Sequence, residues 1–113
     1  MSDWKVILAP DFRADVRAIH SYIANTLLAP ETALNQIRRI MDVAKSLNEM
    51  PMRFSLYEKE PWHSRGLRKV PVDNFIVFYL PNEKTKEVVA FHAFYGGQNI
   101  DEIMREEAKK LDD

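Results

Sequence analysis

The chain has 113 residues, of which 46% are apolar and 29% are charged, with a formal net charge of −1 and no cysteine. This length provides for one domain, residues 1–113, without a second core, and the lack of cysteine excludes disulfides and thiolate metal sites. A domain that binds nucleic acid by charge alone would carry more lysine and arginine, and neither a signal peptide nor an apolar run of about 18 residues is present, so we expect a cytoplasmic protein.

Two amphipathic helices are predicted in the first half of the chain, after a short strand at Trp4–Ala9. Pro10 is suited to the first turn of a helix, where its missing N–H costs nothing. Apolar side chains then recur every three or four positions as far as Asn25. Pro30 gives the same start signal for a second helix, which continues to Asn48. The two helices are expected to form a hairpin with one apolar face.

Three extended runs follow a loop at residues 52–65. Leu67–Val72 contains Pro71, which cannot donate to a ladder, so this strand is placed at a sheet edge or beside a bulge. The runs Phe75–Leu80 and Val88–Tyr95 are joined by a polar connection and predict an antiparallel hairpin. In the first of these two runs, alternation points Phe75, Val77 and Tyr79 to one face and Ile76, Phe78 and Leu80 to the other.

The predicted fold class is α+β. An antiparallel sheet of about four strands carries the helical hairpin on one face, in the order β-α-α-β-β-β. The remaining residues, 101–113, form a charged tail with a weak helical stripe. The other face of the sheet has no cover in this arrangement. Because large uncovered apolar surfaces mark contact sites, we expect this face to bind a partner or a second copy of the chain.

The segment from Trp62 to Lys69 has the strongest functional character in the sequence. It joins an aromatic ring, an imidazole and three cations within eight residues. This combination suits contact with phosphate, with a stacked base or with an acidic protein segment. The alternative is an ordinary solvated entry to a strand.

The three histidines give no sign of a metal site. His20, His63 and His92 are expected on a helix, a loop and a strand, and their spacing matches no known ligand pattern. His92 alternates with Val88, Ala90 and Phe94 and is placed on their face, as a hydrogen-bonded sheet histidine or as a site residue. No phosphate-binding loop, dinucleotide-binding glycine pattern or HExxH motif is present, so no cofactor is expected.

Several segments spread over about 100 residues share the order and spacing of one toxin family. They are Ala9-Pro10, Ile19–Ile23, Pro30–Ala33, Leu47–Pro51, Gly66–Arg68, Asp73–Tyr79 and Tyr95–Gly97. In these segments the chain resembles the RelE/ParE superfamily of toxins from bacterial type II toxin–antitoxin modules, often called plasmid stabilisation proteins. The resemblance implies a protein that arrests growth when free and is neutralised by a cognate antitoxin, whose tail crosses the toxin's helices and sheet.

Two activities are implied by the resemblance: ribosome-dependent cleavage of mRNA, and poisoning of DNA gyrase. Ribonucleolytic members carry arginines at the positions of Ile76 and Gln98 and a tyrosine near Met104, whereas Lys69 matches a lysine of their site. Cleavage of RNA needs a proton acceptor and cations that stabilise the phosphorane. A ParE-like toxin, or one of unassigned target, is therefore favoured over a working ribonuclease.

Two alternatives stay open: a RelE-type ribonuclease with a rebuilt site, and an inactive or purely structural binding module. The candidates for catalysis are His63, Arg65, Arg68 and Lys69. The candidates for contact with an antitoxin, with gyrase or with the ribosome and its mRNA are Trp62, Tyr79, His92 and Tyr95.

Overall fold

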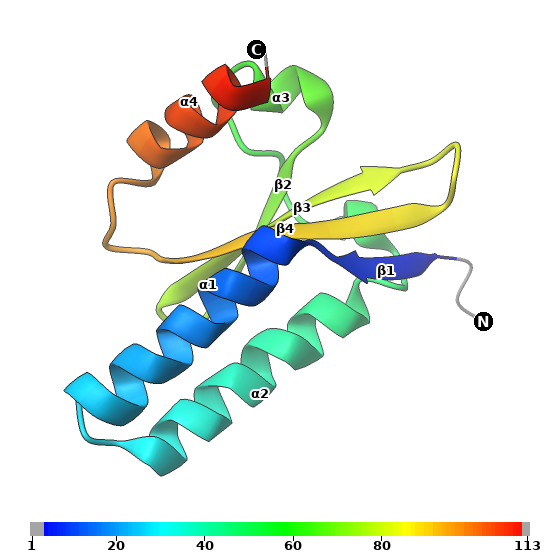
Figure 1. The fold of residues 1–113 in the computed structure, drawn as a ribbon. Coiled ribbons are helices and arrows are strands. Elements are labelled where there is room, and N and C mark those ends of the chain that lie inside the picture. The colour runs from blue at the N-terminus through cyan, green and yellow to red at the C-terminus, as the bar shows by residue number, and fades with distance from the viewer. Residues whose placement is uncertain (1–3, 112–113) are drawn as a thin grey trace.

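A computed structural model describes residues 4–111 of the chain (Figure 1). The helices are α1 (Pro10–Ser21), α2 (Pro30–Ser46), α3 (Trp62–Arg65) and α4 (Ile100–Leu111), with a π-helical turn at Tyr22–Thr26 and a 3-10 turn at Pro51–Arg53. The strands are β1 (Lys5–Leu8), β2 (Arg68–Val72), β3 (Phe75–Asn82) and β4 (Glu87–Tyr95). The predicted order of elements is confirmed, and the short α3 lies in the segment that was expected to be a loop.

The four strands form one sheet in the order β1-β4-β3-β2. β2 pairs antiparallel with β3, and β3 pairs antiparallel with β4. β1 pairs in parallel with β4, with Lys5 opposite Glu87 and Leu8 opposite Ala90. The α+β fold is thus confirmed, but the prediction of an antiparallel sheet was wrong for β1. The sheet is mixed, because β1 and β4 run in the same direction. Pro71 lies on the outer strand β2, where a missing donor is tolerated.

The predicted helical hairpin is present, and α1 and α2 lie side by side on one face of the sheet (Figure 1). Pro10 and Pro30 both occupy the first turn of their helices, where the absent N–H breaks no hydrogen bond. The apolar stripes of the hairpin and the sheet face beneath them form the first core. Its buried side chains are Phe12, Ile40, Ala44, Leu47, Val70, Val72, Val77, Tyr79, Val88, Ala90 and Ala93. Within residues 4–111, no helix has both the length and the apolar character that a membrane span requires.

The opposite face of the sheet is covered by α4, with α3 beside it (Figure 1). Met104 of α4 is fully buried and packs in a second core with Phe78 and Phe94 of the sheet. The expectation that this face is bare was therefore wrong, and self-association through it loses its basis. The helical stripe in the tail looked weak because charged residues fill most of α4, yet Ile103, Met104 and Ala108 suffice to cover the sheet.

The two central strands differ in how strictly their side chains alternate. In β3 the alternation is as predicted, with Phe75, Val77 and Tyr79 in the first core and Ile76, Phe78 and Leu80 in the second. In β4 the register shifts opposite Phe78-Tyr79, and such a bulge turns the following side chains to the other face. Val88 and Ala90 pack in the first core, but His92 stacks on Phe94, with 4.7 Å between ring centroids. The prediction that His92 shares a face with Phe94 is therefore confirmed, and the prediction that it shares this face with Val88 and Ala90 was wrong.

Candidate functional site

The predicted catalytic segment consists of the single turn of α3 and the start of β2. Gly66 ends α3 with φ at +88°, in the left-handed region that favours glycine, and its amide donates to the carbonyl of His63 at 3.1 Å. This turn directs Trp62 into the second core and leaves His63 and Arg65 exposed. The Arg65 guanidinium lies 5.7 Å from the centre of the Trp62 ring.

Arg68 and Lys69 are neighbours in β2 and therefore point to opposite faces of the sheet. Arg68 donates through Nη1 to the carbonyls of Met52 at 3.1 Å and Phe54 at 2.6 Å. Lys69 Nζ lies 2.9 Å from the Glu58 carboxylate, and the hydrogen bond between them lowers the pKa of Glu58. The two cations are thus divided between the two sides of the sheet, and both are engaged by groups of the protein itself.

Three of the four residues predicted to contact a partner lie inside the protein. Trp62 donates its Nε1–H to a main-chain carbonyl of α4 at 2.8 Å. Tyr79 donates its hydroxyl to the carbonyl of Pro51 at 2.7 Å, and burial raises the pKa of Tyr79 to about 12. His92 is only 4% exposed, whereas Tyr95 is 52% exposed. With the chain folded in this way, Tyr95 is the one member of the set that is open to a partner.

The positions at which the family resemblance implies arginine hold uncharged side chains. Ile76 is half-buried and packs against the second core. Gln98 accepts a hydrogen bond from the amide of Tyr95 at 3.0 Å through its Oε1, which closes the turn after β4. Lys69 is the expected cation that the chain does carry, and it is paired with Glu58.

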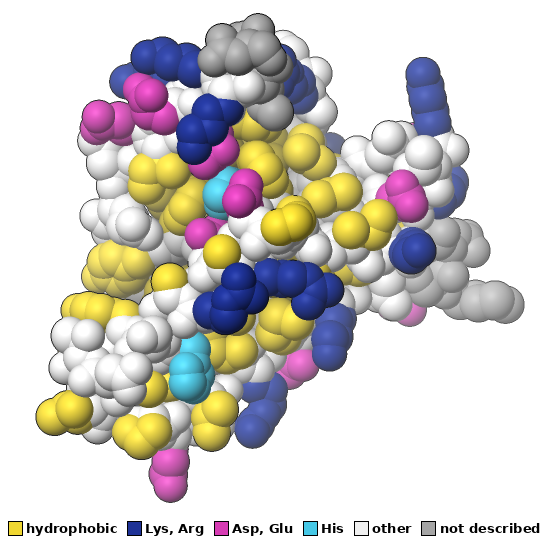
Figure 2. All heavy atoms as spheres, in the orientation of Figure 1, with side chains coloured by type: hydrophobic (Ala, Val, Ile, Leu, Met, Phe, Trp, Pro, Cys, Tyr) yellow, Lys and Arg dark blue, Asp and Glu magenta, His cyan; other side chains and the backbone are white. Residues whose placement is uncertain are grey.

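Exposed apolar side chains gather where α1 passes into α2, at the lower left of Figure 2. The members of this group, which we call the hairpin tip, are Tyr22, Leu27, Leu28 and Leu34. Leu28 is 80% exposed and has φ at +55°, a conformation that a leucine adopts at a cost. Several exposed apolar side chains at one end of a soluble domain are a candidate contact site.

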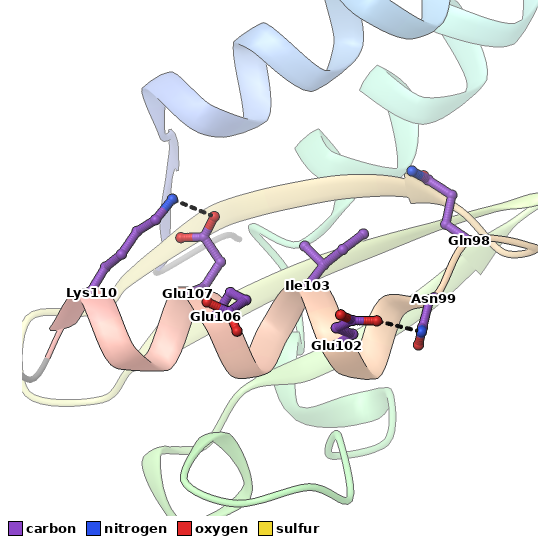
Figure 3. Close-up of a pocket in the computed structure, with 7 residues that line it drawn as sticks. All are labelled: Gln98, Asn99, Glu102, Ile103, Glu106, Glu107 and Lys110. Atoms are coloured by element: carbon purple, nitrogen blue, oxygen red, sulfur yellow. Dashed lines mark hydrogen bonds and ion pairs between the residues drawn. The ribbon is translucent and has the colours of Figure 1, made fainter.

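A shallow hollow of about 540 Å³ extends along α4 (Figure 3). Its lining residues are Gln98, Asn99, Glu102, Ile103, Glu106, Glu107 and Lys110. Three carboxylates and one ammonium make this surface acidic, so it is unsuited to phosphate groups.

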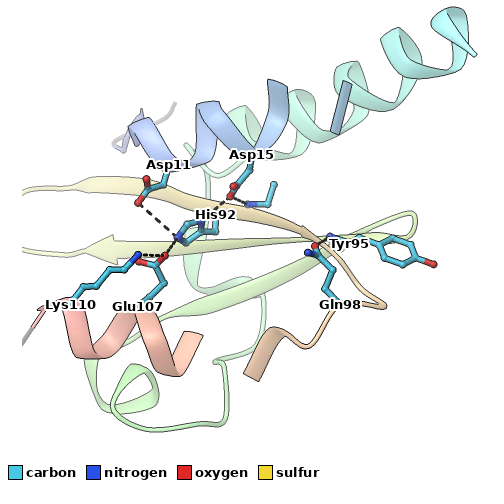
Figure 4. A network of polar contacts seen from close by, with 8 residues as sticks. Asp11, Asp15, His92, Tyr95, Gln98, Glu107 and Lys110 are labelled. Carbon is cyan, nitrogen blue, oxygen red and sulfur yellow. Dashed lines mark hydrogen bonds and ion pairs between the residues drawn. The ribbon is translucent and has the colours of Figure 1, made fainter. Parts of the chain in front are cut away.

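His92 is surrounded by three carboxylates that come from α1 and α4 (Figure 4). Its Nδ1 lies 2.7 Å from Asp15 Oδ2, which also accepts the amide of Ala93 at 3.0 Å. Its Nε2 lies 3.6 Å from Glu107 Oε1 and 3.9 Å from Asp11 Oδ2, and it is buried without a hydrogen-bond partner among the described residues. The histidine spacing could not indicate this cluster, because its other members are carboxylates and come from two different helices.

Three similar solved structures share the fold. A chain of the chromosomal ParDE TA system from P. aeruginosa matches with 20% identity and a TM-score of 0.66, over 81% of this chain and 95% of that chain. The toxin-antitoxin complex RelBE2 from Mycobacterium tuberculosis matches with 14% identity and a TM-score of 0.58, over 81% and 96%. The archaeal RelE-RelB complex from Pyrococcus horikoshii OT3 matches with 15% identity and a TM-score of 0.57, over 87% and 99%. At these identities the similarity establishes the fold alone.

The family is established by a separate match over most of the chain. Among curated proteins, none matches. The family model described as "ParE toxin of type II toxin-antitoxin system, parDE" matches residues 6–98, from β1 to the turn that Gln98 closes. The matched range includes both helices of the hairpin, all of β2, β3 and β4, and β1 from Val6 onwards. The chain therefore belongs to the ParE toxin family of type II toxin–antitoxin systems.

Proposed function

We propose that this toxin arrests growth in the cytoplasm when it is free and that a cognate antitoxin neutralises it by binding. The observation that carries the proposal is the match of the ParE toxin family to residues 6–98. The similar structures from P. aeruginosa, M. tuberculosis and P. horikoshii support it, because each is a toxin–antitoxin system or complex. We also propose that residues 1–113 form a single toxin domain.

The antitoxin is proposed to contact the hairpin tip. α4 already covers the sheet face that the sequence had suggested for this purpose. Four of the exposed large apolar side chains among the described residues lie instead at the end of the helical hairpin, with Leu28 the most exposed. A segment that folds on binding gains affinity by covering such side chains, since burial of apolar surface is worth about 25 cal/mol per Å².

We further infer that the toxin acts on its target by binding and not by cutting RNA. RNA cleavage through the 2′-hydroxyl needs a proton acceptor and cations that meet at one phosphate. Arg68 is bound to main-chain carbonyls and Lys69 to Glu58, on opposite sides of the sheet. Ile76 and Gln98 supply no charge at the expected arginine positions. Gyrase is accordingly the first target to test, and the ribosome with its mRNA is the second.

Inducible expression tests the proposal directly. Expressed alone, the toxin should stop growth, and co-expression of an antitoxin candidate encoded beside it should restore growth. Purified toxin should inhibit supercoiling by gyrase in vitro, while mapped mRNA 5′ ends in induced cells should show no new cuts at ribosomal A sites. Harmless expression of correctly folded protein would contradict the toxin function. Arrest accompanied by new A-site cuts would contradict action by binding alone and would favour the ribonuclease.

A further inference from the structure

We propose that Asp11, His92 and Glu107 bind a zinc ion, which connects α1, β4 and α4. The three side chains come from separate elements, and their ligand atoms lie within 4.8 Å of one another. Neither the sequence motifs nor the family assignment points to this site. The inference is independent of the proposed target and antitoxin, because it depends only on the cluster around His92.

The buried Nε2 of His92 is the observation that points to a ligand. His92 is 4% exposed, and its Nε2 has no hydrogen-bond partner among residues 4–111. A neutral ring whose Nδ1–H is donated to Asp15 presents a lone pair at Nε2 with no donor to meet it. A charged ring would present an N–H there, and the nearest carboxylate oxygens, at 3.6 Å and 3.9 Å, are too far for a hydrogen bond. A metal ion between these atoms satisfies the lone pair and both carboxylates.

Asp15 holds the imidazole in the tautomer that a metal requires. Asp15 Oδ2 lies 2.7 Å from His92 Nδ1 and is itself fixed by the amide of Ala93 at 3.0 Å. A carboxylate that accepts the far N–H of a ligand histidine is the usual support in zinc sites, since it fixes the ring and makes the ligand nitrogen more basic. Figure 4 shows that the Nε2 side of the His92 ring faces Asp11 and Glu107.

Charge also favours a divalent cation at this point. Asp11, Asp15 and Glu107 place three carboxylates around one ring, and Glu107 is only 19% exposed at its side chain. Unpaired charges in a partly buried setting are costly. Lys110 approaches Glu107 at 3.7 Å, but it is 74% exposed and can turn away to solvent. A dication would balance Asp11 and Glu107 directly.

The donor set and spacing select zinc over magnesium or calcium. Imidazole nitrogen is a ligand for zinc and its neighbours, whereas magnesium and calcium prefer oxygen alone. Tetrahedral zinc, with bonds of about 2.0–2.2 Å, separates its ligand atoms by about 3.3–3.6 Å. The separations from Nε2, 3.6 Å to Glu107 and 3.9 Å to Asp11, lie at or just above this range, and all three ligand atoms lie within 4.8 Å of one another. The exposed side chain of Asp11 can move to close the set. Three protein ligands leave a fourth position for water. Glu107 also lines the hollow along α4.

Titration with Zn²⁺ and Co²⁺ tests the site in the full chain. One equivalent of Co²⁺ should give the strong visible absorption of a tetrahedral ion, and Zn²⁺ should displace it. Zn²⁺ should also raise the unfolding temperature and slow hydrogen exchange in α4, because the ion ties α4 to α1. Mg²⁺ and Ca²⁺ should neither raise the unfolding temperature nor slow hydrogen exchange in α4.

Matched variants separate this site from adventitious binding. Glu107→Gln and Asp11→Asn each replace one ligand carboxylate by an amide of the same shape, and should abolish the cobalt spectrum while the apo protein stays folded. Asp15→Asn removes only the support of the ring and should weaken Zn²⁺ binding by about 10–100-fold. Glu106→Gln, an exposed neighbour paired with Lys109, is the control and should bind as the wild type does. The proposal is overturned if cobalt keeps the spectrum of the hydrated ion, or if Glu107→Gln and Glu106→Gln bind Zn²⁺ equally.

Discussion

Trp62 donates its indole Nε1–H to the main-chain carbonyl of Met104 at 2.8 Å, which joins α3 to α4 inside the second core. A second hydrogen bond lies one turn nearer the start of α4, where Tyr57 donates its hydroxyl to Asp101 Oδ1 at 2.5 Å. Burial, followed by this hydrogen bond and the charge of Asp101, raises the pKa of Tyr57. The C-terminal helix is therefore attached by specific polar contacts as well as by apolar packing.

Met104→Ala should destabilise the protein by about 2–5 kcal/mol, since Met104 is fully buried and its truncation leaves a cavity under α4. Urea unfolding measures the loss, and hydrogen exchange should accelerate most within α4. Lys109→Ala, an exposed change in the same helix, is the control and should stay within about 0.5 kcal/mol of the wild type. Equal stability of the two variants would mean that α4 is not packed on the sheet as described.

Tyr79→Phe should cost about 1–3 kcal/mol near neutral pH, because the buried carbonyl of Pro51 loses its donor. The raised pKa of Tyr79, about 12 against 10.0 for the free group, adds a pH dependence. Its stabilising contribution is complete below about pH 10 and is lost as pH rises towards about 12, since the unfolded tyrosine ionises first. The stability gap between wild type and Tyr79→Phe should therefore narrow by roughly 1 kcal/mol at pH 10.5. Urea unfolding at pH 8 and at pH 10.5 measures this difference in stability. A difference that does not change with pH would contradict the raised pKa of Tyr79.

Arg39→Ala should raise the pKa of Asp73 towards its ordinary value. Arg39 Nε donates to Asp73 Oδ2 at 2.6 Å and Gln36 Nε2 donates at 3.0 Å, and these bonds hold the pKa down. At pH values above the pKa that Asp73 has in the unfolded chain, its lowered pKa stabilises the folded state. This stabilisation is lost as pH falls through the pKa that Asp73 has in the folded protein. NMR titration of the side-chain carboxyl carbon measures the change. Arg38→Ala is the control, because Arg38 donates to Asn35 instead; identical titration of Asp73 in all three proteins would refute the prediction.

Lys69→Ala and His63→Ala should leave growth arrest intact if the toxin acts by binding. Lys69 is occupied by Glu58, and His63 is exposed on α3. Colony counts after induction measure arrest, and the soluble yield of each variant shows that it is folded. Loss of arrest in a folded variant, together with loss of mRNA cuts, would restore the ribonuclease as the better explanation.

Leu28→Asp should weaken antitoxin binding by at least about tenfold, the effect of losing roughly 1.4 kcal/mol of apolar contact at the hairpin tip. Aspartate tolerates the positive φ of this position better than leucine does, so the fold should be kept. Met50→Asp is a closely matched control. The side chain of Met50 is 74% exposed and its φ is positive, as for Leu28, but it lies beyond the other end of α2. Calorimetry with the antitoxin candidate measures both, and equal affinities would place the contact elsewhere.

Local signals in the sequence were sufficient to predict most of the fold. Pro10 and Pro30 mark the helix starts, the spacing of apolar residues gives the hairpin, and Pro71 assigns β2 to an edge. The bulge opposite Phe78-Tyr79 was not predictable, because it depends on pairing between two strands and not on either strand alone. That single shift explains why the environment of His92 was misjudged.

The candidate site was harder to predict, because its members meet only through tertiary structure. Asp11, His92 and Glu107 come from three different elements of the chain. The three histidines, whose spacing a sequence pattern can test, do not lie together in this cluster. The charged composition of α4 concealed how few apolar residues it needs to cover the sheet. Residues such as Trp62 that looked suited to a partner are used instead to hold the protein together.

Pro71 on the outer strand has a consequence for the behaviour of the protein at high concentration. The start of β2 is already hydrogen-bonded to the preceding loop. The amide of Tyr57 donates to the carbonyl of Leu67, and the amide of Lys69 donates to the carbonyl of Ser55. Beyond it, the proline offers no donor to an incoming chain. Another chain therefore cannot readily add as a further strand along β2, and this edge of the sheet is protected from amyloid-like aggregation.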